Sequence, residues 1–308
     1  MFMGWVAASK SRIDNRRGAS LPGLVPGLRA PALSCFRLLL FGAALLVASC
    51  AGGPEGRRQA VADNAAKAGF DLHRFSAGKF VLTGYLRQRP AAAEALSVLT
   101  VYIEGDGYAW ASRTQISTDP TPKEPVSFAL AERDSGARVL YLGRPCQYTT
   151  AETGRNCDAR YWSSHRFAAE VIESTSTAID QAKQLAGAVT VEIIGYSGGG
   201  VVAALVAARR DDVARLVTVA APLDHETWTR HHKVSPLSGS LSPMTELPRL
   251  ALIPQRHIVG EDDNIVPALV VQSYLNRLQS PRATLTMAAG ADHQCCWAEH
   301  WPMLKGKL

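Results

Sequence analysis

The chain has few aromatic residues, few charged residues and few cysteines for its 308 residues: 7% are aromatic, 19% are charged, and six are cysteine. No basic stripe interleaved with aromatic residues is present, so a nucleic-acid partner is not expected. No Cys-x-x-Cys or His-x-x-x-His grouping with metal-ligand spacing occurs, and we therefore expect no metal site. The sequence also contains no internal repeat.

The chain lacks an apolar run long enough to cross a bilayer, but it has a shorter one near its start. Residues 38–49 are twelve apolar or small residues behind Arg37, which suits the core of a secretory signal. The ending Val-Ala-Ser-Cys resembles the bacterial lipobox. That resemblance implies a leader at residues 1–49 and a lipid on Cys50. Ala51, directly after this cysteine, resembles the signal that directs lipoproteins to the outer membrane. We therefore expect a cell-envelope protein whose lipid anchors it to the periplasmic face of the outer membrane, which is its expected membrane partner.

Most of the excess positive charge lies in this leader. The whole chain carries 33 Lys and Arg against 27 Asp and Glu, and residues 1–49 hold six of the basic and one of the acidic residues. The rest of the chain is nearly neutral, at 27 against 26. The pI of about 9.1 is therefore mainly a feature of the export segment.

Ser197 lies in a Gly-Tyr-Ser-Gly-Gly pentapeptide between a β-type run at residues 189–194 and a helical pattern at residues 201–208. A nucleophile elbow needs small residues two positions before and after the serine, because a Cβ there would collide with the adjoining strand or helix. Both positions are glycine. A serine in such a turn often only caps a helix, so its partners decide the interpretation. With the partners described next, Ser197 is the predicted nucleophile.

A serine nucleophile needs a base and a group that orients the base. Two later β-type runs, residues 250–259 and 283–288, lead into Gly-Glu-Asp-Asp-Asn-Ile-Val-Pro and Gly-Ala-Asp-His. This order of Ser, Asp and His resembles the α/β-hydrolase superfamily, whose late strands commonly end in Gly-x-x-Asp-x-x-Val-Pro and Gly-x-x-His. The resemblance implies that Asp263 is the acid and His293 the base. Two reserve candidates are Asp262 and His300.

The oxyanion formed during attack needs backbone N–H donors. The elbow geometry offers the amide of Gly198. The β-type run at residues 98–103 leads into Glu-Gly-Asp-Gly, which resembles the His-Gly-x-Gly turn of many hydrolases, with Glu104 in place of the histidine. This resemblance implies a second donor at Asp106 or Gly107. The Glu104 carboxylate would oppose the developing charge unless it is turned away or paired.

From residue 71 onward, β-type and helical segments alternate without a long linker, which predicts a mostly parallel sheet with helices on both faces. We expect one α/β-hydrolase domain at residues 71–308, preceded by a lipidated N-terminus and glycine-rich tether at residues 50–70. The predicted strands cover residues 79–86, 98–103, 138–142, 189–194, 216–220, 250–259 and 283–288. The predicted helices cover residues 126–134, 165–185, 201–209, 268–278 and 297–304.

Two stretches interrupt the alternation. Residues 222–247 follow the strand after the elbow helix, where α/β-hydrolases often carry a cap; a cap-like insertion and a surface excursion are both open. Residues 144–162 contain aromatic side chains that either line the cleft or pack beneath the loop.

Four cysteines follow Cys50, and export places them in an oxidising compartment, where an even number is consistent with bridging. We favour a disulfide between Cys146 and Cys157, although four cysteines allow three pairings. Cys295 and Cys296 are adjacent, and free thiols, a vicinal pair or packing residues are all open.

These features predict a lipid-anchored serine hydrolase that cleaves esters of small-molecule or lipid-like substrates without a cofactor. His293 would take the proton of Ser197, Asp263 would hold the imidazole in the productive tautomer, and water would release the acyl group. Thioesterases, acyltransferases and peptidases use the same triad and stay alternatives. A non-catalytic envelope lipoprotein is a further alternative, but no triad member is missing here.

Overall fold

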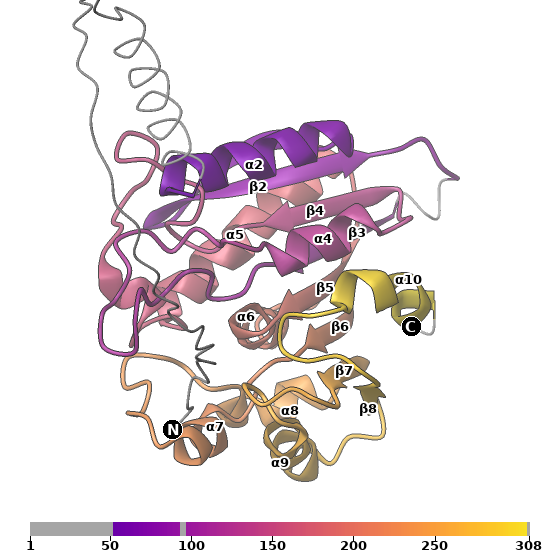
Figure 1. Cartoon of the computed structure of the whole chain (residues 1–308). Coiled ribbons are helices and arrows are strands. Elements are labelled where there is room, and N and C mark those ends of the chain that lie inside the picture. The colour runs from indigo at the N-terminus through magenta and orange to yellow at the C-terminus, as the bar shows by residue number, and fades with distance from the viewer. Residues whose placement is uncertain (1–51, 93–96, 307–308) are drawn as a thin grey trace, which may run out of the picture. The chain divides into compact units, whose positions relative to one another are not determined.

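The computed structural model describes residues 52–92 and 97–306. Its centre is one eight-stranded sheet with the order β1-β2-β4-β3-β5-β6-β7-β8 (Figure 1). Strand β2 pairs antiparallel with β1 and β4, and the pairs from β4 through β3, β5, β6 and β7 to β8 are parallel. Parallel neighbours need crossover connections, which the helices supply. The predicted mostly parallel sheet is confirmed.

The strands are β1 (Asp71–Ala77), β2 (Phe80–Gln88), β3 (Val98–Ile103), β4 (Arg138–Leu142), β5 (Thr190–Tyr196), β6 (Val213–Val219), β7 (Gln255–Gly260) and β8 (Ala283–Ala288). The α-helices are α2 (Pro54–Lys67), α4 (Val126–Glu132), α5 (Ala169–Ala186), α6 (Gly198–Ala207), α7 (His225–His232), α8 (Leu247–Leu250), α9 (Ala268–Leu278) and α10 (Trp297–Gly306). Two short 3-10 helices are η1 (Ala159–Trp162) and η2 (Pro243–Thr245).

Side chains of the central strands enter two hydrophobic layers, one on each face of the sheet. In β3, Leu99, Val101 and Ile103 join the layer that contains residues of α5, α6 and α9, whereas Tyr102 joins the layer that contains residues of α2, α4 and α10. Helices α4 and α5 lie on opposite faces (Figure 1). Because successive strand residues point to opposite faces, both faces of β3 are buried, as expected for a central parallel strand.

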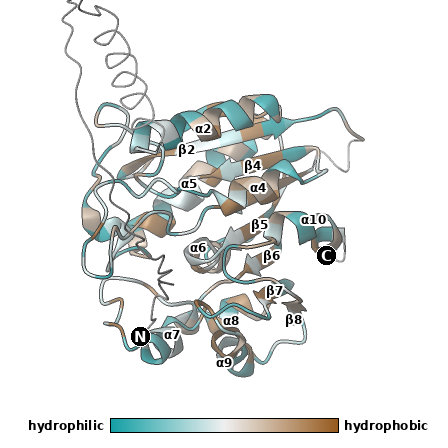
Figure 2. Ribbon diagram, viewed as in Figure 1, coloured by the Kyte–Doolittle hydropathy of each residue, from teal (hydrophilic) through white to brown (hydrophobic). Residues whose placement is uncertain are grey.

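The first described helix differs from the prediction. Residues 50–70 are predicted to be a tether, but Pro54–Lys67 forms α2. Val61 and Ala65 of this helix are buried in the hydrophobic layer that also contains residues of α4 and α10. Much of the remaining surface of the helix is hydrophilic (Figure 2). So few buried positions give a weak amphipathic pattern, which explains why the sequence does not reveal the helix.

Strand β1 is also missing from the predicted elements. It lies at the edge of the sheet, and only Phe75 and Ala77 of its seven residues are buried. Ala77 pairs with Phe80, so residues 78–79 form a two-residue hairpin turn. The predicted start of the next strand at residue 79 is therefore one residue early.

The strand that precedes the predicted acid begins later than the apolar run in the sequence. Residues 250–259 are predicted to be one strand, but Leu247–Leu250 forms α8 and β7 is Gln255–Gly260. Pro254, which has no backbone N–H, directly precedes the strand. A continuous apolar run does not distinguish the end of a buried helix from a buried strand.

The predicted leader, residues 1–49, and the predicted lipidation site, Cys50, lie outside the residues that the structure describes. Within the described part of the chain, no helix combines the length and the apolarity needed to cross a membrane. The leader and the lipidated cysteine therefore stay predictions.

Candidate active site

Ser197 occupies a strained turn between β5 and α6. Its φ of 52° is positive, a conformation that non-glycine residues rarely adopt and that occurs at functional sites. A Cβ on Gly195 would lie 2.3 Å from the carbonyl oxygen of Gly199, and one on Gly199 would lie 2.4 Å from the carbonyl oxygens of Ile103 and Glu104. The two glycines therefore allow the turn to form and to pack against the end of β3.

The structure brings Ser197, His293 and Asp263 into one hydrogen-bonded chain. The Ser197 Oγ lies 3.1 Å from His293 Nε2, and His293 Nδ1 lies 2.9 Å from Asp263 Oδ2. The other carboxylate oxygen of Asp263 accepts hydrogen bonds from the amides of Ile265 at 2.8 Å and Val266 at 2.7 Å. Asp263 is buried, and these two amides fix the orientation of its carboxylate.

The reserve candidates lie outside this chain of hydrogen bonds. Asp262 is exposed one residue before Asp263, and its amide donates to the carbonyl oxygen of Ala291. His300 lies on α10. Nothing in the described residues joins either side chain to Ser197 or His293.

The loop that carries His293 is held by three short contacts. Tyr196, the residue before the nucleophile, donates its hydroxyl to the carbonyl oxygen of His293 at 2.6 Å, and the Trp297 indole donates to the same oxygen at 3.0 Å. The Asp292 carboxylate accepts from the Cys295 amide at 2.6 Å. The sequence left the state of Cys295 and Cys296 open, and the structure pairs them in a vicinal disulfide.

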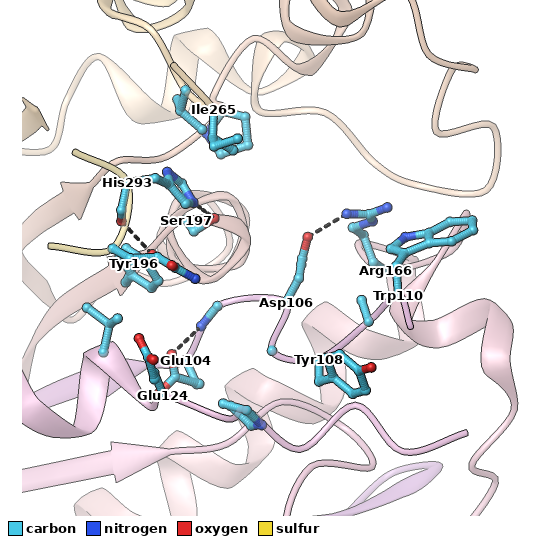
Figure 3. Close-up of a pocket in the computed structure, with 18 of the residues that line it drawn as sticks. Glu104, Asp106, Tyr108, Trp110, Glu124, Arg166, Tyr196, Ser197, Ile265 and His293 are labelled. Carbon is cyan, nitrogen blue, oxygen red and sulfur yellow. Dashed lines mark hydrogen bonds and ion pairs between the residues drawn. The ribbon is translucent and has the colours of Figure 1, made fainter. Parts of the chain in front are cut away.

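Glu104 lies at the pocket but its carboxylate is paired. It accepts a hydrogen bond from the Gly105 amide at 2.8 Å (Figure 3). It also accepts one from the Tyr141 hydroxyl at 2.8 Å. Burial raises the pKa of Glu104 to about 7, and the hydrogen bonds from Gly105 and Tyr141 oppose that rise. The pairing and the partial protonation both reduce the negative charge that this residue presents near Ser197.

Asp106 contributes a side chain whose role the sequence did not reveal. A Cβ on Gly198 would lie 2.1 Å from Asp106 Oδ1, so this carboxylate packs against the start of α6. It is bound by Arg144 at 3.0 Å and by Arg166, which come from two other loops. Burial alone would raise the pKa of Asp106, but these guanidinium groups hold it below its ordinary value. The three charged groups together carry one net positive charge.

The predicted oxyanion donors are arranged so that their amides are free. The Gly105 amide is bound by Glu104, and the Tyr108 amide donates to the carbonyl oxygen of Pro120 at 3.0 Å. Within residues 52–92 and 97–306, the amides of Gly198, Asp106 and Gly107 have no hydrogen-bond acceptor. Gly107 has φ +64°, and a Cβ there would lie 2.1 Å from the Pro120 carbonyl oxygen. Both Asp106 and Gly107 thus stay candidates.

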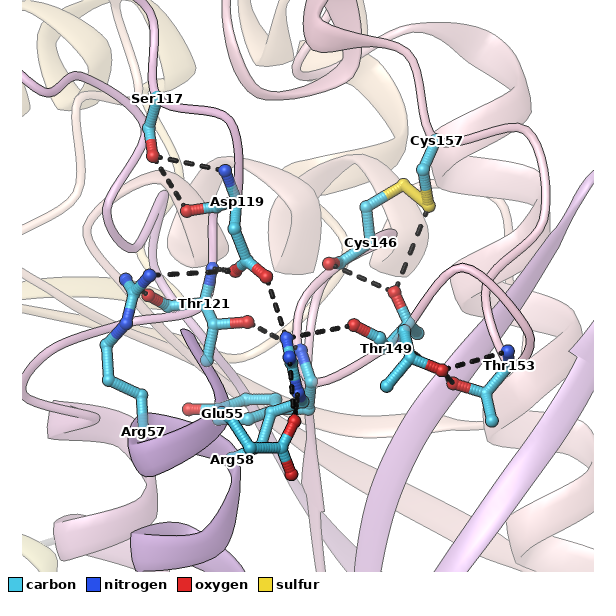
Figure 4. A network of polar contacts seen from close by, with 12 residues as sticks. Glu55, Arg57, Arg58, Ser117, Asp119, Thr121, Cys146, Thr149, Thr153 and Cys157 are labelled. Carbon is cyan, nitrogen blue, oxygen red and sulfur yellow. Dashed lines mark hydrogen bonds and ion pairs between the residues drawn. A yellow bond between two sulfur atoms is a disulfide. The ribbon is translucent and has the colours of Figure 1, made fainter. Parts of the chain in front are cut away.

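The loop after β4 contacts residues 104–108, the segment after β3 that we call the oxyanion loop. Gln147 donates to the carbonyl oxygen of Gly105 at 2.9 Å and accepts from the Arg144 amide at 2.9 Å. The structure joins Cys146 to Cys157, the pair favoured from the sequence (Figure 4). The disulfide thus closes the loop that contains Gln147, and Arg144 lies two residues before that loop.

A cavity of about 400 Å³ opens beside Ser197. Trp110 and Arg166 lie across it from Ser197 (Figure 3). The cap-like stretch at residues 222–247 contributes a mixed group to its wall, consisting of Pro222, His225, Trp228 and Leu237. The stretch therefore shapes the pocket. The aromatic residues of residues 144–162 pack instead beneath their loop, since these three are buried and do not line the cavity: Tyr148, Tyr161 and Trp162.

The fold is shared with solved hydrolase structures. The chain is similar to Est1E from Butyrivibrio proteoclasticus, with a TM-score of 0.55 and 15% identity over 77% of this chain and 96% of that chain. It is also similar to a Pyrococcus furiosus esterase, with a TM-score of 0.55 and 16% identity over 77% of this chain and 88% of that chain.

A third similar structure is an α/β serine hydrolase homologue from Coxiella burnetii, with a TM-score of 0.52 and 15% identity over 77% of this chain and 94% of that chain. No protein-family model and no curated protein sequence matches the chain. The protein has the α/β-hydrolase fold. Its chemistry must therefore be argued from its own site.

Proposed function

We propose that the protein is a serine hydrolase that cleaves carboxylic esters. The observation that carries this proposal is the hydrogen-bonded chain from Ser197 Oγ to His293 Nε2 at 3.1 Å and from His293 Nδ1 to Asp263 at 2.9 Å. A serine hydroxyl becomes a useful nucleophile when an oriented imidazole accepts its proton. The free amides beside the elbow give the developing oxyanion its donors.

The reaction proceeds in two halves. His293 Nε2 takes the proton of Ser197 as Oγ bonds to the ester carbonyl carbon, and the carbonyl oxygen becomes an oxyanion. When the C–O bond to the alcohol breaks, His293 gives that proton to the departing alcohol, which leaves an acyl-enzyme. Water then adds to the acyl carbon while His293 takes its proton. Collapse of the second intermediate releases the carboxylic acid and returns the proton to Ser197.

The pocket suits an ester with an apolar acyl or alcohol group of moderate size. Ala109, Phe167, Leu237 and Val266 contribute apolar surface to a cavity of about 400 Å³, within the usual range for ligand sites. An ester series of graded acyl length, assayed with its thioester and anilide counterparts, ranks the ester activity against the thioesterase and peptidase alternatives.

Two experiments test the hydrolase assignment. A fluorophosphonate probe with mass mapping should label Ser197 in the folded parent and leave Ser197→Ala unlabelled at that peptide. Hydrolysis of p-nitrophenyl esters should fall by roughly 10³-fold or more in Ser197→Ala, because the residual rate comes only from substrate binding and the oxyanion donors. Equal hydrolysis by the parent and Ser197→Ala would reject the proposal.

We also propose that a lipid on Cys50 anchors the protein in the cell envelope, at the periplasmic face of the outer membrane. The lipobox-like ending before Cys50 supports this, and Ala51 supports the choice of membrane. Metabolic labelling with a fatty acid tests the attachment. Cys50→Ala should lose the label, and the leader variant Cys35→Ala should keep it.

A further inference from the structure

We propose that the catalytic pocket faces the membrane that carries the anchor, and that its substrates are lipid esters held in that bilayer. This inference rests on the proposed hydrolase activity and on the proposed lipid attachment at Cys50. It is argued from the position at which α2 begins, the exposed apolar side chains around the pocket, and the lining of the pocket itself.

The chain direction places the start of α2 at the catalytic edge of the sheet. Strand β1 is antiparallel to β2, and β2 is antiparallel to β4, so β1 runs in the same direction as the parallel strands. Three residues, 68–70, separate the end of α2 from the start of β1, and the helix packs beside the strand. Helix and strand therefore run in opposite directions. The N-terminal end of α2 therefore lies at the carboxyl ends of β3, β4 and β5 (Figure 1). Ser197 directly follows β5 at this edge.

Side-chain contacts fix this end of α2 to the loops around the pocket. Arg58 binds Asp119 at 2.8 Å and the carbonyl oxygen of Thr149 at 3.1 Å (Figure 4). Arg57 donates to the carbonyl oxygen of Thr121, and its guanidinium lies 5.2 Å from the centre of the Tyr108 ring. Tyr108 lines the pocket. The first turn of α2 therefore contacts a residue of the pocket wall.

The proposed anchor is close to this point along the chain. Cys50 precedes Pro54, the first residue of α2, by four positions. Four residues span at most about 14 Å even when fully extended. Pro54 itself is exposed at the start of the helix. A lipid on Cys50 would thus hold the catalytic edge within a short distance of the bilayer surface.

Exposed apolar side chains occur in the pocket wall and in the chain segments that directly follow lining residues. Trp110, Val234, Ile265 and Leu269 are 42%, 48%, 50% and 42% exposed. Trp110 comes from the loop after β3, Val234 from the cap-like stretch, Ile265 from the loop between β7 and α9, and Leu269 from the first turn of α9. We call these four residues the apolar rim. Apolar side chains with an indole ring are typical of protein surfaces that rest in the interfacial layer of a bilayer.

The lining of the pocket fits a lipid that enters from this side. Trp110 and Ile265 belong both to the apolar rim and to the pocket wall, so apolar surface continues from the outside toward Ser197. An acyl chain that leaves the bilayer along this path stays in contact with apolar groups, which lowers the cost of its transfer. A water-soluble ester would gain nothing from the two outer residues of the rim, Val234 and Leu269.

The test compares two matched double variants of the full, lipid-bearing chain. Val234→Ser with Leu269→Ser alters the outer rim, and Val189→Ser with Leu252→Ser alters exposed residues that precede β5 and β7 at the opposite edge. Each protein is reconstituted into phosphatidylcholine and phosphatidylglycerol vesicles that contain a fluorogenic diacylglycerol ester. The same proteins are assayed in detergent with p-nitrophenyl butyrate.

The rim variant should lower hydrolysis of the vesicle ester by about tenfold, since a loss of about 1.4 kcal/mol of interfacial contact has that effect. It should leave p-nitrophenyl butyrate hydrolysis unchanged, and the opposite-edge variant should leave both rates unchanged. Equal vesicle rates for the two variants, with the soluble ester still cleaved, would overturn the membrane-facing inference alone. Failure of the parent to cleave either ester faster than Ser197→Ala would overturn the proposed hydrolase function.

A second variant tests the anchor distance separately. A flexible Gly-Ser insertion between Gly52 and Gly53 leaves α2 and the pocket unchanged but lengthens the connection to Cys50. Because a longer flexible connection lowers the effective concentration of the pocket at the bilayer, vesicle hydrolysis should fall several-fold while soluble hydrolysis stays constant. An unchanged vesicle rate would contradict the claim that the short connection holds the catalytic edge at the membrane.

Discussion

The triad half of the candidate site and its oxyanion half are held in place by different kinds of contact. Asp263 is fixed by two amides that lie two and three residues ahead of it, and His293 is fixed through its own backbone carbonyl. Asp106 is fixed by Arg144 and Arg166, which are 38 and 60 residues away in the chain. The acid of the triad is thus oriented by local backbone amides and its base by the uncharged side chains of Tyr196 and Trp297, whereas the oxyanion loop depends on ion pairs with distant arginines.

This difference predicts how each half fails when it is altered. A substitution of the triad acid should change which nitrogen of His293 carries the proton. It should leave the loop that carries residue 263 in place, because the amides of Ile265 and Val266 still bind that side chain. A substitution in the oxyanion half should move backbone, because charged side chains from other loops support it.

Asp263→Asn should reduce kcat by about 10⁴-fold with little change in thermal stability. The Asn carbonyl would accept from the amides of Ile265 and Val266, so its NH₂ would face His293 Nδ1. That nitrogen would then have to accept, which leaves the proton on Nε2 and prevents it from taking the Ser197 proton. Steady-state kinetics with a p-nitrophenyl ester measures the loss. Asp262→Asn, the exposed neighbour, should keep parental kcat; an equal loss there would contradict the assignment.

Arg144→Met should reduce kcat by about 10²-fold and leave KM nearly constant, because displaced oxyanion donors affect the transition state more than the bound ester. It should also lower the melting temperature, since Asp106 and the buried end of the loop lose a partner. Arg144→Lys should recover part of kcat by restoring the charge. Arg249→Met is the matched control, because Arg249 is exposed and pairs with an exposed Asp211. A raised KM with unchanged kcat would contradict this role.

Glu104→Gln should change the pH dependence of stability. The pKa of Glu104 is raised from 4.5 to about 7 in the folded protein, so the folded state binds a proton that the unfolded state has lost between these values. The stability of the parent should therefore fall as pH rises through this window, by an amount on the order of 2–3 kcal/mol from this group. Urea unfolding from pH 4.5 to 8 should show a smaller fall in Glu104→Gln. Identical curves would place the carboxyl's pKa near its ordinary value.

The smallest effect is expected from Cys295→Ser with Cys296→Ser. The His293 loop keeps its contacts to Tyr196 and Trp297 without the vicinal disulfide, so kcat should fall by less than about fivefold, a change of under 1 kcal/mol. Steady-state kinetics of the variant and of the untreated parent with a p-nitrophenyl ester measure the change, with the Cys146–Cys157 disulfide intact in both proteins. A loss comparable to that of Asp263→Asn would show that the triad half also depends on a cross-link.

The contrast also explains what the sequence could predict. Ser197, Asp263 and His293 follow strands at short, regular offsets, and such local spacing is visible in a linear pattern. The elements α2 and β1 were missed because few of their residues are buried, which weakens apolar periodicity. The pairing of Asp106 with Arg144 and Arg166 was missed for another reason: nothing local to Asp106 identifies partners that the topology brings from other loops.

The contact between Gly199 and the carbonyl oxygens of Ile103 and Glu104 has a consequence for engineering the protein. The elbow and the start of the oxyanion loop touch through bare backbone, so even a methyl group inserted between them would push the nucleophile and the amide donors apart together. Variant libraries aimed at new substrate preferences should therefore leave the residues of this backbone contact unchanged. The productive positions for such variation lie instead on the outer walls, in the cap-like stretch and around Trp110.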